Sequence, residues 1–381
     1  MNTAITPFVL DVPQADLDDL QRRLANTRWP ERETVADWSQ GAPLAKVRAL
    51  CDYWRTGYDW RRCEARLNGL GQFKTEIDGL GVHFLHVRSP HPNALPLLIT
   101  HGWPGSVIEF LKVVGPLTDP VAHGGRAEDA FHVIAPSVPG FGFSDKPSAT
   151  GWNIKRIADA FITLMARLGY ERWVAQGGDV GAFVSTAIGV ARPAGCLAIH
   201  LNMPLAGPTP EDRENPTPAE EASLAASAEF ARTGQGYSAQ QSTRPQTLGY
   251  GLVDSPAGQA AWIYEKLWAW SDNRGAPEDV FTFDEMLDNI MLYWLPAAAA
   301  SAARLYWEGA RLRASSRLDL PVGVSIFPKE ISRPSRRWAE RRMSNIIYWK
   351  ELDRGGHFAA WEQPELFVQE LRDCFRLVRP A

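Results

Sequence analysis

The residue whose neighbours best suit covalent chemistry is Asp179. It stands in Gln176-Gly177-Gly178-Asp179-Val180-Gly181, between an apolar run typical of a buried strand and a helical pattern. A small-x-nucleophile-x-small sequence at a strand-to-helix turn is the pattern of a nucleophile elbow, which lifts the nucleophile above a sheet. The same residues also suit an aspartate that caps a helix after a glycine turn. Taken alone, the motif leaves both interpretations open.

A glycine-rich loop supplies context for Asp179. His101-Gly102-Trp103-Pro104-Gly105 directly follows an expected strand, where the second donor of an oxyanion hole is expected. The two donors would be the backbone N–H groups of Trp103 and Val180. The glycines let the backbone approach closely. A plain tight turn could have this sequence too, but its position after a strand and before a helix favours the oxyanion role.

Two later side chains complete an order of nucleophile, acid and base along the chain. His357, in a Gly-Gly-His-Phe segment, follows the last expected strand. Its ordinary pKa lies near neutrality, which suits a general base. Glu330 follows the penultimate strand and is the expected acid that orients this base. Asp353 is a rival acid, but it lies within four residues of His357 and is more typical of a surface charge.

The elements that must position these residues alternate between strands and helices from residue 96 onward. Such alternation indicates an α/β fold with a mostly parallel sheet and helices on both faces. The expected strands are 96–101, 131–136, 173–176, 196–201, 321–327 and 345–349. The expected helices of this part are 106–118, 153–169, 180–192 and 364–376.

Two regions lie outside this alternation. The first 70 residues are helical in pattern, with helices expected after Pro13 and over 44–53, and a β-hairpin is expected over 73–87 around Asp78-Gly79. Residues 205–300 begin with a short low-complexity stretch (206–222) and continue as helical, Trp-rich sequence. An insertion here predicts a helical cap over the carboxyl edge of the sheet, where such sheets bind ligands.

Composition excludes several classes of function. The net charge of −4 does not indicate electrostatic attraction to nucleic acid or to an anionic membrane. The four cysteines lack zinc-ligand or CxxC spacing, so they are expected to be reduced, buried thiols. No stretch resembles a signal peptide or a membrane span. A cytoplasmic location is therefore expected.

Over nearly its whole length, the sequence resembles the microsomal-type epoxide hydrolase family, which has an α/β-hydrolase fold. The resemblance is carried by Gln-Gly-Gly-Asp179, His101-Gly-Trp-Pro-Gly105, Pro136-Ser-Val-Pro-Gly-Phe-Gly-Phe-Ser-Asp145, Asp254-Ser-Pro-Ala-Gly258 and Arg354-Gly-Gly-His-Phe-Ala-Ala-Trp-Glu362. The most specific part is the N-terminal segment with Pro7-Phe8 and Asn26-Thr-Arg-Trp-Pro30, because dehalogenases and ordinary esterases lack it. The resemblance implies an N-terminal extension (1–90) that runs into the first core hairpin. It further implies a core in two parts (91–204 and 301–381) and a helical cap or lid (205–300).

The resemblance also implies the reaction. Tyr237 and Tyr306 match two tyrosines that hold the epoxide oxygen in the family, beside Trp103. The implied enzyme converts an epoxide to a vicinal diol through an Asp179 ester, which is hydrolysed by water activated by His357 and Glu330. No cofactor or metal is required. The implied partner is a small-molecule epoxide, with a homodimer as one option. The net charge and the N-terminal sequence add the expectations of no nucleic-acid partner and no membrane anchor, and the second is a departure from mammalian microsomal members, which carry an N-terminal anchor.

One departure from the family lies beside the nucleophile. Members commonly carry a tryptophan at the position that Val180 occupies. Because the oxyanion donor there is a backbone N–H, catalysis should survive with a smaller pocket wall.

Two alternatives remain at this stage. A haloalkane or haloacid dehalogenase shares the aspartate elbow and the histidine, but it needs donors for a halide rather than paired cap tyrosines. A non-catalytic ligand-binding homologue is the second, since a fold alone does not prove activity. Such proteins usually lack at least one catalytic residue of the active family members, whereas this sequence has a matching residue at every catalytic position.

Overall fold

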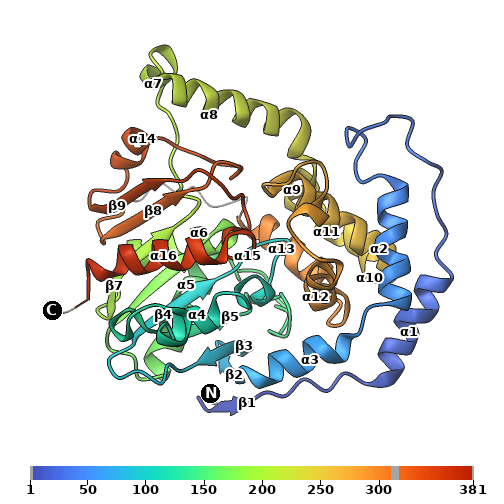
Figure 1. Cartoon of the computed structure of the whole chain (residues 1–381), viewed down its shortest axis with the longest axis horizontal. Helices are drawn as coiled ribbons and strands as arrows, with labels where there is room; N and C mark the ends of the chain where they lie inside the picture. The colour runs from blue at the N-terminus through green and yellow to red at the C-terminus, as the bar shows by residue number, and fades with distance from the viewer. Residues whose placement is uncertain (1–2, 310–316, 380–381) are drawn as a thin grey trace.

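A nine-stranded sheet runs through the molecule in the order β1-β2-β3-β5-β4-β6-β7-β8-β9 (Figure 1). The computed structural model describes residues 3–309 and 317–379. Strands β4 to β9 are parallel, whereas β1, β2 and β3 are antiparallel to their neighbours. The strands are β1 (Ile5–Pro7), β2 (Gln72–Ile77), β3 (Leu80–Val87), β4 (Leu95–Thr100), β5 (Phe131–Pro136), β6 (Trp173–Gly177), β7 (Cys196–Leu201), β8 (Val322–Ile326) and β9 (Ile346–Glu351). The mostly parallel sheet predicted from the sequence is confirmed.

The hairpin of β2 and β3 forms where its turn residues predict it. Ile77 pairs with Leu80, which leaves the two-residue loop Asp78-Gly79. Both residues have positive φ, 52° and 77°, as a type I′ turn requires. Strand β1, which the sequence analysis did not predict, adds an antiparallel edge to β2.

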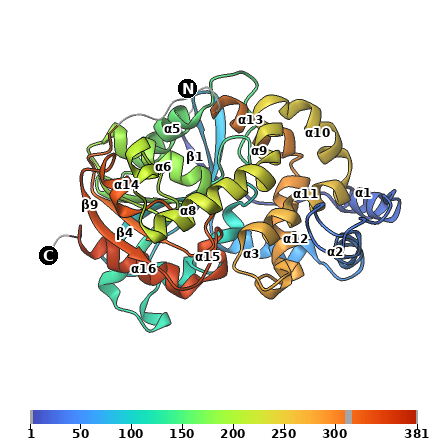
Figure 2. The ribbon, with the colours of Figure 1, turned by 90° about the horizontal axis from the view of Figure 1, so that it is seen from above.

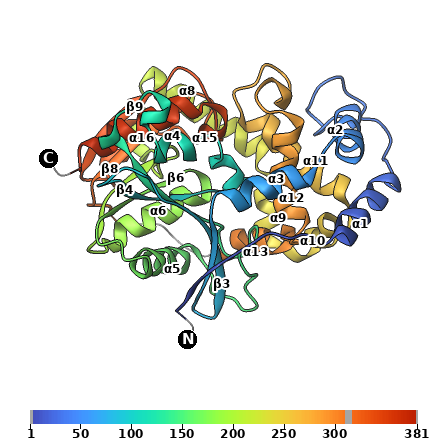
Figure 3. The same ribbon diagram turned by 60° about the horizontal axis from the view of Figure 1, so that its bottom comes forward.

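Helices cover both faces of the sheet, as expected (Figure 3). Helices α5 (Ile154–Arg167) and α6 (Asp179–Ala191) pack together on one face, and α5 buries Ile157, Phe161 and Leu164 at helical spacing. The other face carries α4 (Val114–Thr118), α15 (Ala359–Glu362) and α16 (Pro364–Arg376). Shorter elements of the core are η2 (Val121–His123), η3 (Ala127–Asp129) and α14 (Arg336–Glu340).

The single helix expected over 106–118 is wrong. The chain instead forms a 3-10 turn, η1 (Val107–Phe110), and then restarts as α4. Pro116 lacks the backbone N–H that a continuous α-helix would donate to Lys112. Ser106 stabilises the tighter turn, because its side chain accepts a hydrogen bond from the Ile108 N–H.

The segment after β7 forms the inserted layer of helices (Figure 2). Its elements are α7 (Pro210–Glu214), α8 (Pro218–Glu229), the π-helical turn η4 (Phe230–Gly234), α9 (Gly236–Thr243), α10 (Pro245–Asp254), α11 (Pro256–Trp270), η5 (Pro277–Asp279), α12 (Phe283–Trp294) and α13 (Ala299–Gly309). The low-complexity stretch 206–222 contains α7 and the start of α8, because Thr209 and Thr217 each begin a helix with a capping box. The cap boundary expected at residue 300 lies inside α13, so we propose a cap that extends to Gly309.

The N-terminal extension packs on the cap. Its helices are α1 (Gln14–Ala25), α2 (Leu44–Thr56) and α3 (Trp60–Gly69), and α1 and α2 lie beside α11 (Figure 2). The hydroxyl of Tyr58 and the guanidinium of Arg62 both donate to Asp288 of α12, each at 2.8 Å. Asp288 is buried, so these charge-assisted bonds fix the extension to the cap.

All four cysteines are buried free thiols. Within residues 3–309 and 317–379, no helix is long and apolar enough to cross a membrane.

Candidate active site

Asp179 sits on a strained turn between β6 and α6. Its φ of 46° lies in the left-handed region, which costs a non-glycine residue free energy and is held only by tight surroundings. Those surroundings require glycine on both sides. A Cβ atom on Gly177 would lie 2.0 Å from the Gly181 carbonyl oxygen, and one on Gly181 would lie 1.9 Å from the Thr100 carbonyl oxygen. The small residues of the motif therefore reflect close packing of β4, β6 and α6.

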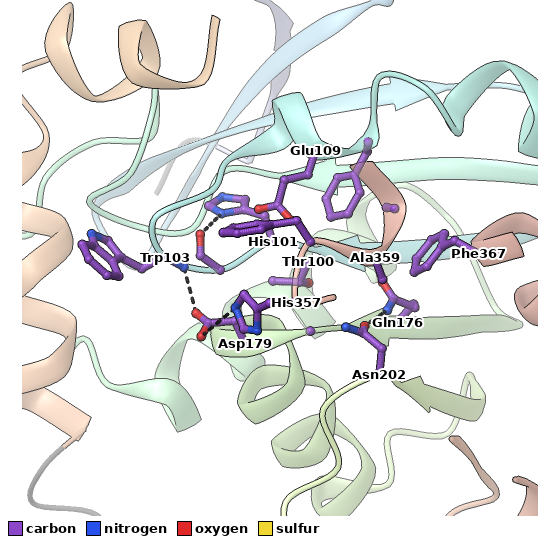
Figure 4. Close-up of a pocket in the computed structure, with 15 residues that line it drawn as sticks. Thr100, His101, Trp103, Glu109, Gln176, Asp179, Asn202, His357, Ala359 and Phe367 are labelled. Atoms are coloured by element: carbon purple, nitrogen blue, oxygen red, sulfur yellow. Dashed lines mark hydrogen bonds and ion pairs between the residues drawn. The ribbon is translucent and has the colours of Figure 1, made fainter. Parts of the chain in front are cut away.

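The Asp179 carboxylate contacts the glycine-rich loop and His357 (Figure 4). The Trp103 N–H donates to its Oδ1 at 2.8 Å, and His357 Nε2 lies 3.5 Å from its Oδ2. Gly102 allows this approach, because a Cβ there would lie 2.3 Å from Oδ1. Val180, the other expected donor, follows Asp179 directly, and the role of its N–H stays a prediction. One carboxylate oxygen is thus held by the backbone, and the other faces the histidine.

Side chains of the cap helix α12, which no motif in the sequence singles out, hold the loop itself. Asn289 of α12 accepts from the Ser106 hydroxyl at 2.7 Å and donates to the Pro104 carbonyl at 2.8 Å. The Tyr293 hydroxyl donates to the Gly105 carbonyl at 2.7 Å. These cap residues lie more than 180 positions along the chain from the loop. No local pattern could therefore have indicated them.

Replacing Asn289 with alanine should destabilise the protein and misplace the Trp103 N–H. The buried Pro104 carbonyl and Ser106 hydroxyl would lose their partners, so we expect the free energy of unfolding to fall by about 1–3 kcal/mol. Chemical denaturation measures this change. Asn345, which is exposed, provides the matched Asn-to-Ala control. Equal stability of both variants would contradict the assigned role of Asn289.

His357 is held between two carboxylates. Its Nδ1 lies 2.7 Å from Glu330 Oε1, and its backbone N–H donates to the Trp270 carbonyl at 2.9 Å. Burial opposes protonation of the imidazole, but Glu330 and Asp179 outweigh it and raise the pKa of His357 well above its ordinary value. The rival acid, Asp353, is exposed and pairs with Arg354. The structure therefore places Glu330, and not Asp353, against the histidine.

The two tyrosines lie with Trp103 in an aromatic cluster. The Tyr237 ring stacks on Trp103 with centroids 4.8 Å apart, and the Tyr306 ring meets Trp103 edge-on at 5.9 Å. The centroids of Tyr237 and Tyr306 are 5.8 Å apart. Burial, and then the Asp179 carboxylate, raise the pKa of both phenols. Both are therefore protonated at neutral pH and can donate a hydrogen bond. Trp270 also joins the cluster, at 5.1 Å from Tyr237.

A largely apolar cavity of about 650 Å³ opens on this group. Asp179, Val180, Tyr237 and Tyr306 all line it. Its remaining walls come from both core and cap, and they include Phe183, Val190, Met203, Leu205, Phe230, Leu305 and Ile331. An apolar cavity with a few convergent polar groups is typical of a small-molecule site.

Two family models match the chain. One, described as the epoxide hydrolase N terminus, matches residues 5–110. The other, the alpha/beta hydrolase fold, matches residues 96–252. Together they cover the N-terminal extension, the loop at 101–105 and the turn at Asp179.

Individual relatives match nearly the whole chain. A Stigmatella aurantiaca protein named "Putative epoxide hydrolase" is 62% identical over 98% of this chain and 86% of its own length. Epoxide hydrolase 1 of Sus scrofa is 34% identical, over 98% of this chain and 89% of its own. The solved structure of Aspergillus niger epoxide hydrolase superimposes with a TM-score of 0.87 and 32% identity, covering 99% of this chain and 97% of that one. The resemblance inferred from the motifs is thereby confirmed: the chain belongs to the epoxide hydrolase family of the α/β-hydrolase fold.

Proposed function

We propose that the protein hydrolyses a small-molecule epoxide to a vicinal diol through a covalent ester of Asp179. One observation carries this proposal. A single carboxylate has one oxygen bound by a backbone N–H and the other facing a histidine, and it lines the same apolar cavity as two protonated tyrosines. The names of the relatives support the same reaction.

In the first half of the proposed reaction, Asp179 Oδ2 attacks an epoxide carbon. The carbon–oxygen bond of the ring breaks, and its electron pair goes to the ring oxygen. Tyr237 and Tyr306 donate hydrogen bonds to that oxygen, and one of them gives it a proton. Such acid catalysis is worth about 10²–10⁴-fold in rate. Asp179 Oδ1 stays on the Trp103 N–H and becomes the ester carbonyl oxygen.

In the second half, His357 acts as the base. Ester formation removes the negative charge of Asp179, one of the two charges that raise the pKa of the imidazole. The pKa of His357 therefore falls when the ester forms, and the neutral imidazole can accept a proton from water. The water attacks the ester carbonyl carbon, while the Trp103 N–H, with that of Val180, stabilises the oxyanion. Glu330 orients the imidazole and balances the imidazolium charge.

Diol formation from styrene oxide tests this function directly. A single turnover in ¹⁸O-labelled water should place the label in the Asp179 carboxylate, because the attacking water becomes one of its oxygens. Halide release from chloroalkanes without any diol would favour the dehalogenase, and tight epoxide binding without conversion would favour the non-catalytic homologue. No particular observation supports either alternative. A cytoplasmic location, a homodimer and the lack of nucleic-acid binding stay predictions from the sequence.

Removing either tyrosine hydroxyl should slow ester formation and leave ester hydrolysis nearly unchanged. Loss of one preorganised donor costs about 10²-fold in rate, so we expect that decrease in Tyr237→Phe and in Tyr306→Phe. Rapid mixing with styrene oxide, followed by quenching and intact mass, measures the rate of ester formation. Tyr250→Phe is the matched control, because Tyr250 lies on cap helix α10 and is 70% exposed. Unchanged ester formation in both active-site variants would contradict their role.

A further inference from the structure

Asp179 borders two cavities of different character. The larger one contains the tyrosines, whereas the second has a volume of about 20 Å³ and is lined by Asp179, His357, Glu109 and Thr100, among others (Figure 4). A cavity of this size has room for one water molecule. Neither His357 nor Glu109 is among the described residues that line the larger cavity. The proposed base thus faces Asp179 across the small cavity and not across the large one.

The lining of the small cavity has unused hydrogen-bonding capacity. Thr100 is 1% exposed, and its hydroxyl finds no hydrogen-bond partner within the described part of the chain. A buried polar group without a partner calls for an explanation such as an ordered water. By contrast, Gln176 and Asn202, which also line the cavity, bond each other at 2.8 Å.

Glu109 brings a carboxyl group to the same cavity. It lies on η1, four residues after the end of the glycine-rich loop. Gly105 leaves room for it, because a Cβ there would lie 1.5 Å from Glu109 Oε1. Burial raises the pKa of the Glu109 carboxyl to about 8, so it is mostly uncharged at neutral pH. An uncharged carboxyl can face Asp179 without strong repulsion and still hydrogen-bond a water molecule.

We propose that Glu109 and Thr100 hold the hydrolytic water in the small cavity, so that substrate and water reach Asp179 from two separate cavities. This inference rests on the proposed function. One water hydrogen goes to His357 Nε2 as the water oxygen bonds to Cγ of the Asp179 ester, and the other is held by the Glu109 carboxyl oxygen. The Thr100 hydroxyl donates to the water. The bond from Cγ to the ester oxygen then breaks, and the diol oxygen takes the proton from His357. The carboxyl group left on Asp179 gives the remaining water proton to the tyrosinate formed by ring opening, so Asp179 is again a carboxylate and the tyrosine is again protonated.

The arrangement predicts that Glu109 affects only one half of the reaction. In Glu109→Leu, which keeps a similar volume without a polar group, hydrolysis of the ester should slow by about tenfold or more through misplacement of the water. Ester formation should stay within about twofold of the wild-type rate. Glu109→Gln, which keeps a polar oxygen, should restore most of the hydrolysis rate. Quenched-flow mass spectrometry with styrene oxide measures both rates, and Glu128→Gln on the exposed surface is the control.

Thr100→Val provides an independent measurement if Glu109→Leu fails to fold. The Thr100→Val variant should hydrolyse the ester about three- to tenfold more slowly, which is the change in rate that corresponds to the net free energy of one hydrogen bond. The rate of ester formation should be unchanged. Wild-type hydrolysis rates in the folded variants, equal slowing of both halves, or no rescue by glutamine would overturn the inference. If the wild-type protein forms no ester at Asp179, it is the proposed function that fails.

Discussion

Asp179→Asn should lower the rate of diol formation by about four orders of magnitude or more, the scale seen when a covalent catalyst loses its nucleophile. The amide oxygen is a much weaker nucleophile than a carboxylate oxygen. The amide also carries no charge for His357 to pair with. Because the side chain keeps its shape, the Trp103 N–H can still find an acceptor, and the fold should be retained. The loss should therefore appear in ester formation, and it is measured as the initial rate with styrene oxide.

Two precautions make this result decisive. Asparagine can deamidate slowly to aspartate, so the variant is assayed fresh, and its mass is checked at position 179. Asp353→Asn is the matched control, because Asp353 is exposed and pairs only with its neighbour Arg354 among the ion pairs described. It should retain wild-type activity, which also tests its exclusion as the triad acid. Wild-type turnover in fresh Asp179→Asn would refute the covalent scheme.

His357→Gln should stop the reaction after ester formation. The nucleophile, the tyrosines and the Trp103 N–H all remain, so the epoxide should still be opened. Without an imidazole, no base takes the proton of the attacking water, and the ester should accumulate to about one per protein molecule. Intact mass after mixing with styrene oxide should rise by the mass of one epoxide, and steady-state turnover should fall by about 10³-fold or more.

The location of the adduct distinguishes this outcome from nonspecific alkylation. Proteolysis should place the added mass on the peptide that contains Asp179, and the double variant with Asp179→Asn should take up none. His123→Gln, at an exposed histidine on η2, should turn over normally and accumulate no ester. Rapid hydrolysis of the ester in His357→Gln would mean that another group activates the water.

The sequence determined the order of the core elements because their signals are local. Alternating apolar runs and helical patterns predicted the parallel strands, and Asp78-Gly79 predicted the hairpin turn. Helix α3 lies within the first 70 residues, which are helical in pattern, but it was not predicted as a separate helix, although Trp60, Cys63 and Leu67 recur at helical spacing behind an N-cap at Asp59. Local sequence signals also exist for the end of helical structure near Pro116 and for the helix starts at the capping boxes of Thr209 and Thr217.

The candidate nucleophile, base and acid could be chosen from the sequence because each follows the end of a strand, and parallel strands bring those ends to one edge of the sheet. Tyr237 and Tyr306 could be chosen only through resemblance to a family, since nothing in their own neighbours distinguishes them. Which acid faces His357 was decided by the fold. Glu330 is buried 2.7 Å from the imidazole, whereas Asp353, closer in sequence, points to solvent.

Tertiary structure alone decided how the site is supported and divided. Asn289 and Tyr293 hold the 101–105 loop from a cap helix more than 180 residues away, and Glu109 and Thr100 share a small cavity with His357. Such contacts depend on how the cap packs against the core. Packing between distant elements produces no periodic pattern in the sequence. The sequence by itself therefore determined which side chains at the carboxyl edge of the sheet are candidates for catalysis. The packing of cap against core decided which groups surround Asp179, because a cavity is formed by side chains that meet only in the folded chain.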